Sequence, residues 1–175
     1  MHEEYLQDAF EFYTKGLDTG DQREAKRYFR ASVFYTAGAI EAFVNFIADS
    51  FTHSRSLSDH ELAFLSDKNI VFSSDKFVLT EKVEFHRLED KLKFLLKRFD
   101  SSFDFQSSAW SRVSEFKKLR DSLTHPKQSE DELTIEEYQK KLKIGISGTI
   151  EIMNALSKCI FQSPLRKGLL ELIPN

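Results

Sequence analysis

The side chains with the clearest chemical potential lie in the segment Arg120-Asp121-Ser122-Leu123-Thr124-His125. Arg120 offers a planar fork of N–H donors that suits phosphate oxygens. His125 is a histidine, the side-chain type that exchanges a proton near neutral pH. The pair therefore predicts work on a phosphate ester. An Arg followed five residues later by a His is nevertheless common, and it also fits a solvated basic residue and a His near a helix C-terminus.

The geometry of this pair depends on Pro126. On a continuing helix, positions five apart differ by about 140° in azimuth, so the two side chains would not meet. Pro126 disfavours the helical conformation at His125, which places His125 at or just past the helix end. Its ring can then turn back over the last turn, toward Arg120 and Thr124. A hydrogen bond from Asp121 or Thr124 can fix the imidazole tautomer.

Apolar residues at helical spacing predict the elements that hold this segment. They mark long helices over residues 3–17, 21–51, 81–99, 107–124 and 135–161, with short helices at 58–66 and 165–173. Residues 69–72 and 76–79 form either a small hairpin or an ordered loop. Ser107 or Ser108 can cap the helix that carries Arg120, and Thr134 with Glu137 can cap the next one.

The pattern predicts an all-α fold, an up-and-down four-helix bundle with short accessory helices. With 175 residues, of which 41% are hydrophobic, the chain can bury one core, so we expect a single domain over residues 1–175. Gly145 and Gly148 interrupt the last long helix, where each costs about 1 kcal/mol relative to Ala. We expect another helix to approach closely there.

The net charge and the cysteine content restrict the cellular compartments and the classes of binding partner that we expect. The net charge of −3 provides no global positive field that would draw the chain onto DNA or an anionic membrane. Cys159 is the single cysteine, which excludes an intrachain disulfide and fits a reducing compartment. The N-terminus lacks a signal-peptide core, and no uninterrupted apolar run has the length of a membrane span. These features predict a soluble, cytoplasmic protein.

No cofactor or metal is expected. The histidines outside the segment show no metal-ligand spacing with one another or with acidic residues; they are His2, His53, His60 and His86. There is no Gly-rich phosphate loop, nucleophile elbow or paired-Cys motif. Trp110 and the many Phe residues fall at helical intervals, so we interpret them as core and not as base-stacking platforms.

Several charged residues outside the Arg/His pair have two interpretations. Glu41 falls within the apolar stripe of the second long helix, where a carboxylate needs a partner. It is either half of a structural buried pair or a supporting residue for Arg120 or for a dimer interface, and Asn45 shares this ambiguity. A basic rim on the motif helix either positions an RNA backbone or is a solvated face. It consists of Arg112, Lys117, Lys118 and Lys127.

The segment resembles the ribonuclease motif of the HEPN superfamily, an Arg separated by four to six residues from a His, with a polar residue after the Arg. Its surroundings resemble one branch, the RiboL-PSP or MAE-type branch. They include Leu119 before the Arg, Pro126-Lys127 after the His, the run Leu88-Glu89-Asp90-Lys91-Leu92-Lys93-Phe94-Leu95-Leu96, and the helix Ala37-Gly38-Ala39-Ile40-Glu41-Ala42-Phe43-Val44-Asn45. Together these pieces span roughly residues 28–160. Asp121 stands where many members carry Asn.

The resemblance implies a four-helix bundle that dimerises so that two motifs face one cleft and cut RNA without metal. The 2′-OH would attack phosphorus and leave a 2′,3′-cyclic phosphate and a 5′-OH. Arg120 and His125 would be catalytic, Asp121, Thr124 and Glu41 supporting, and Lys117, Lys118 and Lys127 RNA-binding. One histidine per chain supplies only one of the base and the acid, so a homodimer makes physical sense. The implied role is a toxin or antiviral-defence ribonuclease.

Two alternatives remain. The first is a non-catalytic HEPN module that binds a nucleotide, RNA or a partner such as a nucleotidyltransferase antitoxin, a role favoured by the carboxylate of Asp121. The second is a purely structural helical adaptor, in which two copies of the motif never meet across an interface.

Overall fold

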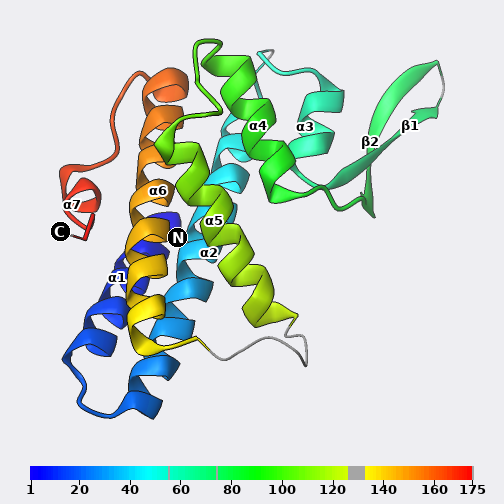
Figure 1. Cartoon of the computed structure of the whole chain (residues 1–175). Helices are drawn as coiled ribbons and strands as arrows, with labels where there is room; N and C mark the ends of the chain where they lie inside the picture. The colour runs from blue at the N-terminus through cyan, green and yellow to red at the C-terminus, as the bar shows by residue number, and fades with distance from the viewer. Residues whose placement is uncertain (55, 74, 126–132, 175) are drawn as a thin grey trace. The chain divides into compact units, whose positions relative to one another are not determined.

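The computed structural model describes residues 1–54, 56–73, 75–125 and 133–174. Within them the chain is mostly helical, with one small two-stranded sheet (Figure 1). The chain forms two compact units, one of residues 1–40 with 102–175 and one of residues 41–101. Each unit is described separately below.

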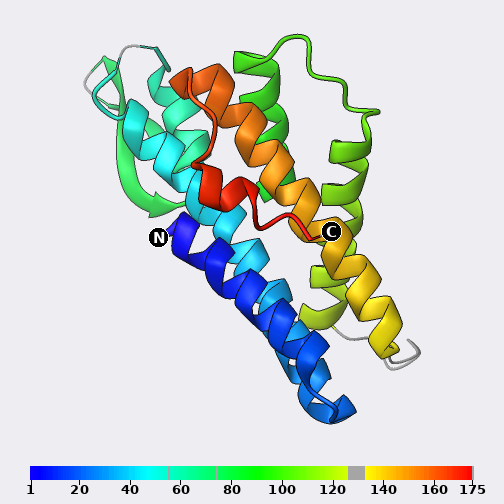
Figure 2. The same cartoon turned by 90° about the vertical axis from the view of Figure 1, so that its left-hand side faces the viewer.

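The first unit begins with a helical hairpin. Helix α1 (His2–Asp18) runs back along the first part of α2 (Gln22–Phe51), as Figure 2 shows. The hydroxyl of Ser32 donates to the carbonyl oxygen of Ala9 at 2.7 Å, which fixes the register of the two helices. At Gly16 an added Cβ would collide with the ring of Phe29, so close packing requires glycine there. The predicted helices over residues 3–17 and 21–51 are confirmed.

The rest of the first unit consists of α5 (Ser108–Thr124), α6 (Ile135–Phe161) and the short α7 (Lys167–Leu170). The expected capping box at Thr134 is confirmed, because its side chain accepts from the Glu137 N–H while Glu137 accepts from the Thr134 N–H. The ring of Phe29 stacks on Tyr138 at 6.1 Å between centroids, which joins α2 to α6. Fully buried residues at the centre of this unit are Leu6, Phe29, Leu142, Ile146 and Ile150.

The second unit contains the end of α2, α3 (Asp59–Leu65), the strands β1 (Lys68–Ser73) and β2 (Lys76–Val83), and α4 (Leu88–Phe99). The strands form an antiparallel hairpin in which Val71 pairs with Val78. Of the two possibilities for this stretch, the hairpin is therefore the one observed. The expected helix over residues 81–99 is wrong at its start, because Val83 pairs with Lys68 in the sheet and α4 begins only at Leu88.

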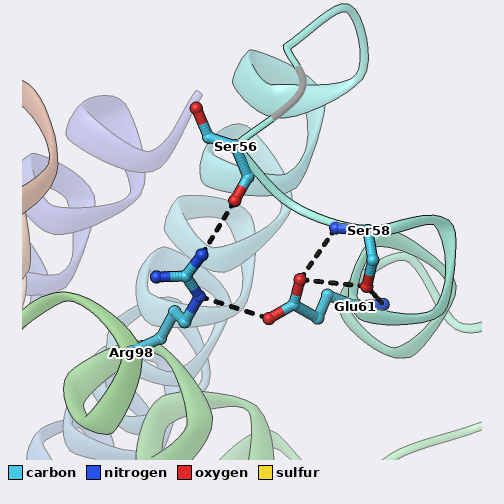
Figure 3. A network of polar contacts seen from close by, with 4 residues as sticks. All are labelled: Ser56, Ser58, Glu61 and Arg98. Carbon is cyan, nitrogen blue, oxygen red and sulfur yellow. Dashed lines mark hydrogen bonds and ion pairs between the residues drawn. The ribbon is translucent and has the colours of Figure 1, made fainter.

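Helices α3 and α4 are tied together by a polar network (Figure 3). Ser58 caps α3 in a capping box with Glu61, and the Ser58 N–H donates to the Glu61 carboxylate at 2.7 Å. Arg98 of α4 donates to Glu61 at 3.3 Å and to the Ser56 carbonyl oxygen at 3.0 Å. Arg98 of α4 thus links the first turn of α3 to the loop that precedes α3.

By length and composition alone, α2 is apolar enough to cross a membrane. Of its most apolar stretch, 56% is buried inside the protein, and the core helix of a soluble protein passes the same test.

Candidate functional site

The last turn of α5 places His125 at a helix end. Ser107 caps the start of α5 by accepting from the Trp110 N–H. The helix ends at Thr124, and His125 has non-helical angles (φ −129°, ψ 66°) while its N–H still donates to the Asp121 carbonyl oxygen at 2.9 Å. The prediction that His125 lies at the helix end is confirmed. Its side chain is exposed, so a substrate can reach it.

Arg120 and Lys117 both form ion pairs with Asp121. The Arg120 Nε lies 3.2 Å from Asp121 Oδ1, and the Lys117 Nζ lies 3.6 Å from Oδ2. Lys117 lies three and four positions before Arg120 and Asp121 and so shares a helix face with both, while the long Arg120 side chain reaches its sequence neighbour Asp121. The carboxylate is therefore neutralised locally, and the Arg120 contact is made through Nε.

Thr124 faces the same side of the helix, but its hydroxyl proton is already used. The hydroxyl donates to the Arg120 carbonyl oxygen at 2.8 Å, a bond typical of Thr on a helix. In this arrangement Thr124 can accept a hydrogen bond from the imidazole but cannot donate one. We call Lys117, Arg120, Asp121, Thr124 and His125 the motif turn. Pro126 and Lys127 lie outside the described residues.

The motif turn is held in place by the packing of α5 on α6. At Gly148 an added Cβ would lie 2.7 Å from the Arg112 Cβ and 3.2 Å from the Val113 backbone nitrogen. At Gly145 it would collide with the Phe116 side chain. The predicted close helix approach at both glycines is thus confirmed. Glycine there lets the backbones approach within a distance that any side chain would prevent.

The expected basic rim of α5 is divided between two faces of the helix. Arg112 pairs with Glu151 of α6 at 2.7 Å and so has a structural partner. Lys118 lies about 100° of helix rotation from Lys117 and, with Ser122, lines a cavity of about 420 Å³ between α5 and α6. Lys117 thus pairs with Asp121, while Lys118 lines the cavity beside it. Lys141 of α6 lines that cavity too, and the sequence reading did not single it out.

Glu41 is exposed, so the expectation that it is a buried carboxylate is wrong. The buried stripe of this part of α2 runs through Ile40, Val44 and Ile47. Glu41 follows Ile40 by about 100° of rotation and therefore falls on the edge of the stripe, facing water. It lines a cavity of about 310 Å³ in the second unit, which Asn45 also lines.

That cavity, which we call the Glu41 cavity, contains an ion pair that the sequence did not reveal. Lys91 of α4 is only 5% exposed, and its Nζ lies 2.6 Å from the Asp67 carboxylate. Asp67 adopts a positive φ of 54° after α3 and accepts the His86 N–H at 2.8 Å. The pairing spans 24 positions in the chain, so no local spacing signals it. The one hint was a lysine among the apolar residues of α4.

The interpretation of the many Phe residues as core is wrong for several of them, because Phe34, Phe46, Phe72 and Phe77 are exposed as well as Phe85. Trp110 is buried as expected, but Phe85 is 87% exposed at the wall of the Glu41 cavity. It lies between the end of β2 and the start of α4, a stretch without the helical periodicity that was assumed for it.

No group of three or more His, Cys, Asp or Glu side chains that could hold a metal ion occurs in the part of the chain that the structure describes.

No protein-family model matches the chain, and neither curated proteins nor solved structures contain a match to it.

Proposed function

We propose that the chain is a metal-independent endoribonuclease of HEPN type that acts in the cytoplasm as a toxin or in antiviral defence. The fold proposed with it is the up-and-down four-helix bundle of that superfamily, with the hairpin and short helices as additions. The observation that carries the proposal is an exposed His125 at the Pro-terminated end of the helix that presents Arg120.

The chemistry needs a proton acceptor for the 2′-OH, a proton donor for the leaving oxygen and positive charge at the phosphoryl oxygens. His125 can perform either proton transfer, since imidazole exchanges a proton near neutral pH. Arg120 would stabilise the developing charge with its guanidinium group. Lys117 and Lys127 would guide the RNA backbone, and Lys118 would do so from beside the cavity that it lines.

One chain supplies one such histidine, so the proposed active form is a homodimer. A second copy would bring its own Arg120 and His125 to the same cleft, which provides the acid and the base together. The exposure of His125 and Thr124 supports this arrangement, because a shared cleft requires the motif turn to face outward.

A second candidate function is a non-catalytic module that binds a nucleotide, RNA or a nucleotidyltransferase antitoxin. The observation that favours it is the ion pair between Arg120 and Asp121. A carboxylate beside a phosphate site repels the substrate unless a cation neutralises it, and here that cation is also the proposed catalytic arginine.

The test is cleavage of single-stranded RNA and tRNA in EDTA by the wild type, Arg120→Ala and His125→Ala, with His53→Ala as an exposed control histidine. We expect cleavage with 2′,3′-cyclic phosphate ends by the wild type and by His53→Ala. Loss of the acid–base group should lower the rate by about a hundredfold or more.

Equal cleavage by all four proteins would reject the catalytic assignment and point to a contaminant. Absence of cleavage by the wild type, together with RNA or nucleotide binding that survives His125→Ala, would favour the non-catalytic module. Mixing the wild type with an excess of His125→Ala chains tests the dimer, because the heterodimers then contain only one His125 and cleavage should fall below the level set by dilution.

A further inference from the structure

We propose that the Glu41 cavity binds a single guanine base, read by the Glu41 carboxylate and stacked on the ring of Phe85. This inference rests on the proposed RNA- or nucleotide-directed function and adds a base preference to it. The cavity lies wholly within the second unit, and its walls come from α2, α4 and the loops that follow α3 and β2.

The size and composition of the cavity suit a base. Its volume of about 310 Å³ lies at the lower end of the range for small-ligand sites, roughly 300–1,000 Å³. Val44 and Leu88 give it apolar walls, while Glu41, Asn45 and Asp67 bring polar groups to it. A planar, partly apolar ligand with hydrogen-bonding edges matches this mixture.

Because Asp67 is engaged in the ion pair with Lys91, Glu41 is the carboxylate in the cavity that is open to a ligand. Both oxygens of Asp67 are already engaged, one by the Lys91 Nζ at 2.6 Å and the other by the His86 N–H at 2.8 Å. Lys91 is buried, so this pair forms a fixed part of the wall. Glu41 is exposed and sits one helical turn before Asn45, so the two side chains share a face of α2.

Guanine complements these two side chains better than other bases do. A carboxylate accepts two parallel hydrogen bonds, and guanine presents two adjacent donors, N1–H and the 2-amino group. Its O6 acceptor lies beside them and suits the amide N–H of Asn45. Adenine and cytosine each present an acceptor where guanine has N1–H, and that acceptor would face the Glu41 carboxylate.

Phe85 supplies the stacking surface. An aromatic ring that is 87% exposed leaves its faces in water, and base stacking on such a ring is a major source of affinity for single-stranded nucleic acids. A guanidinium group could also stack there and pair with Glu41, but it has no acceptor for the amide N–H of Asn45, which guanine supplies with O6.

The test is isothermal titration calorimetry of the full chain with GMP, IMP and AMP, and with agmatine as a guanidinium probe. IMP keeps N1–H and O6 but lacks the 2-amino group. We expect GMP to bind about tenfold or more tightly than AMP, with IMP between them, since a bidentate contact discriminates by about this much. Agmatine should bind more weakly than GMP.

Three variants assign the contacts. Glu41→Gln should remove the preference for GMP over AMP, and Phe85→Ala should weaken every nucleotide by about fivefold or more. Asp90→Asn, an exposed carboxylate of α4 that does not line the cavity, should change nothing. Unchanged thermal unfolding of Glu41→Gln and Phe85→Ala verifies that these variants fold.

Equal affinity for GMP and AMP, or a GMP preference that survives Glu41→Gln, would overturn the inference. So would agmatine binding that depends on Glu41 without any binding of GMP, which would make the cavity a cation site. GMP binding by a wild type that does not cleave RNA would sink only the ribonuclease proposal. Cleavage by a wild type that does not bind GMP would sink only the guanine site.

Discussion

The motif turn and the Glu41 cavity each contain an aspartate paired with a lysine, in opposite surroundings. Asp121 has a side chain that is 44% exposed and pairs with cations from its own helix, whereas Asp67 pairs with a buried lysine 24 positions away. Water screens the exposed ion pairs of Asp121 strongly, but it screens the pair between Asp67 and the buried Lys91 much less. The motif turn is therefore available for ligands at little cost to stability, while the Asp67–Lys91 pair is part of the framework.

The largest expected effect follows from breaking the buried pair. Lys91→Met leaves the Asp67 carboxylate without its cation and should lower the free energy of unfolding by about 3 kcal/mol. The matched change at the motif turn, Lys117→Met, should cost less than about 0.5 kcal/mol, since its pair is exposed and lies within one helix. Urea unfolding of the two variants beside the wild type measures the difference.

A second substitution separates the lost pairing from lost packing. Asp67→Asn retains a residue type that tolerates positive φ and can still accept the His86 N–H. Combined with Lys91→Met, it should restore at least 1 kcal/mol of the loss, because an uncompensated charge is removed. Equal costs for Lys91→Met and Lys117→Met would remove the contrast between the two regions.

The next largest effect concerns what holds the motif turn in position. Gly148→Ala should lower the free energy of unfolding by about 1–3 kcal/mol, because the new methyl group meets Arg112 Cβ and the Val113 backbone. Gly168→Ala is the matched control in the same unit, since no atom lies within 4 Å of its added Cβ. Thermal unfolding compares them. If Gly148→Ala behaves like Gly168→Ala, α5 does not depend on close contact with α6.

A smaller effect concerns the polar network around Glu61 in the unit that holds the Glu41 cavity (Figure 3). The Ser58 N–H bond and, secondarily, Arg98 hold the pKa of Glu61 below its ordinary value. The network's contribution to stability is thus present above the unfolded-state pKa of Glu61 and is lost as the pH falls through the lower, folded-state pKa.

Glu61→Gln should therefore cost about 1 kcal/mol at neutral pH, the usual value of such a cap, and the difference from wild type should shrink at acid pH. Urea unfolding across the acid range measures this. Glu84→Gln, an exposed carboxylate of the same unit, is the control and should stay parallel to the wild type. A difference between wild type and Glu61→Gln that does not change with pH would contradict the assignment.

The sequence was sufficient where neighbouring residues decide the structure. The end of α5 at His125, the capping box at Thr134 and the close approach at Gly148 each depend on residue types within a few positions or on one helix surface. The start of α4 was wrong because helical spacing around Val83 is also compatible with a strand, and cross-strand pairing with Lys68 decided the outcome.

Local sequence patterns carry no information on distant contacts, and this also explains which features of the candidate sites were missed or misplaced. Glu41 was placed inside the apolar stripe because sequence spacing does not resolve its edge. The contact of Lys91 with Asp67 depends on how α3 and α4 meet, which no local pattern encodes. Lys117 and Lys118 are adjacent in sequence, yet about 100° of helix rotation separates them, so Lys117 pairs with Asp121 while Lys118 lines the cavity between α5 and α6.

The smallest expected effect tests whether Asp121 restrains the motif turn. Asp121→Asn removes the carboxylate that pairs with Arg120 and Lys117, so on the proposed function RNA affinity should rise about two- to fivefold at low salt and less at high salt. Stability should change by less than about 0.5 kcal/mol, because the pair is exposed. Fluorescence anisotropy with labelled single-stranded RNA, in a His125→Ala background that prevents cleavage, measures the affinity.

Asp18→Asn is the matched control, because it removes one exposed carboxylate from α1 and changes the net charge by the same amount. If both substitutions raise RNA affinity equally, the effect comes from the overall charge of the chain and the ion pair at Arg120 is irrelevant to binding. If Asp121→Asn alone raises it, the carboxylate holds the arginine back from phosphate. The motif turn would then carry its own restraint, whereas the carboxylate of Asp67 only stabilises the unit around it.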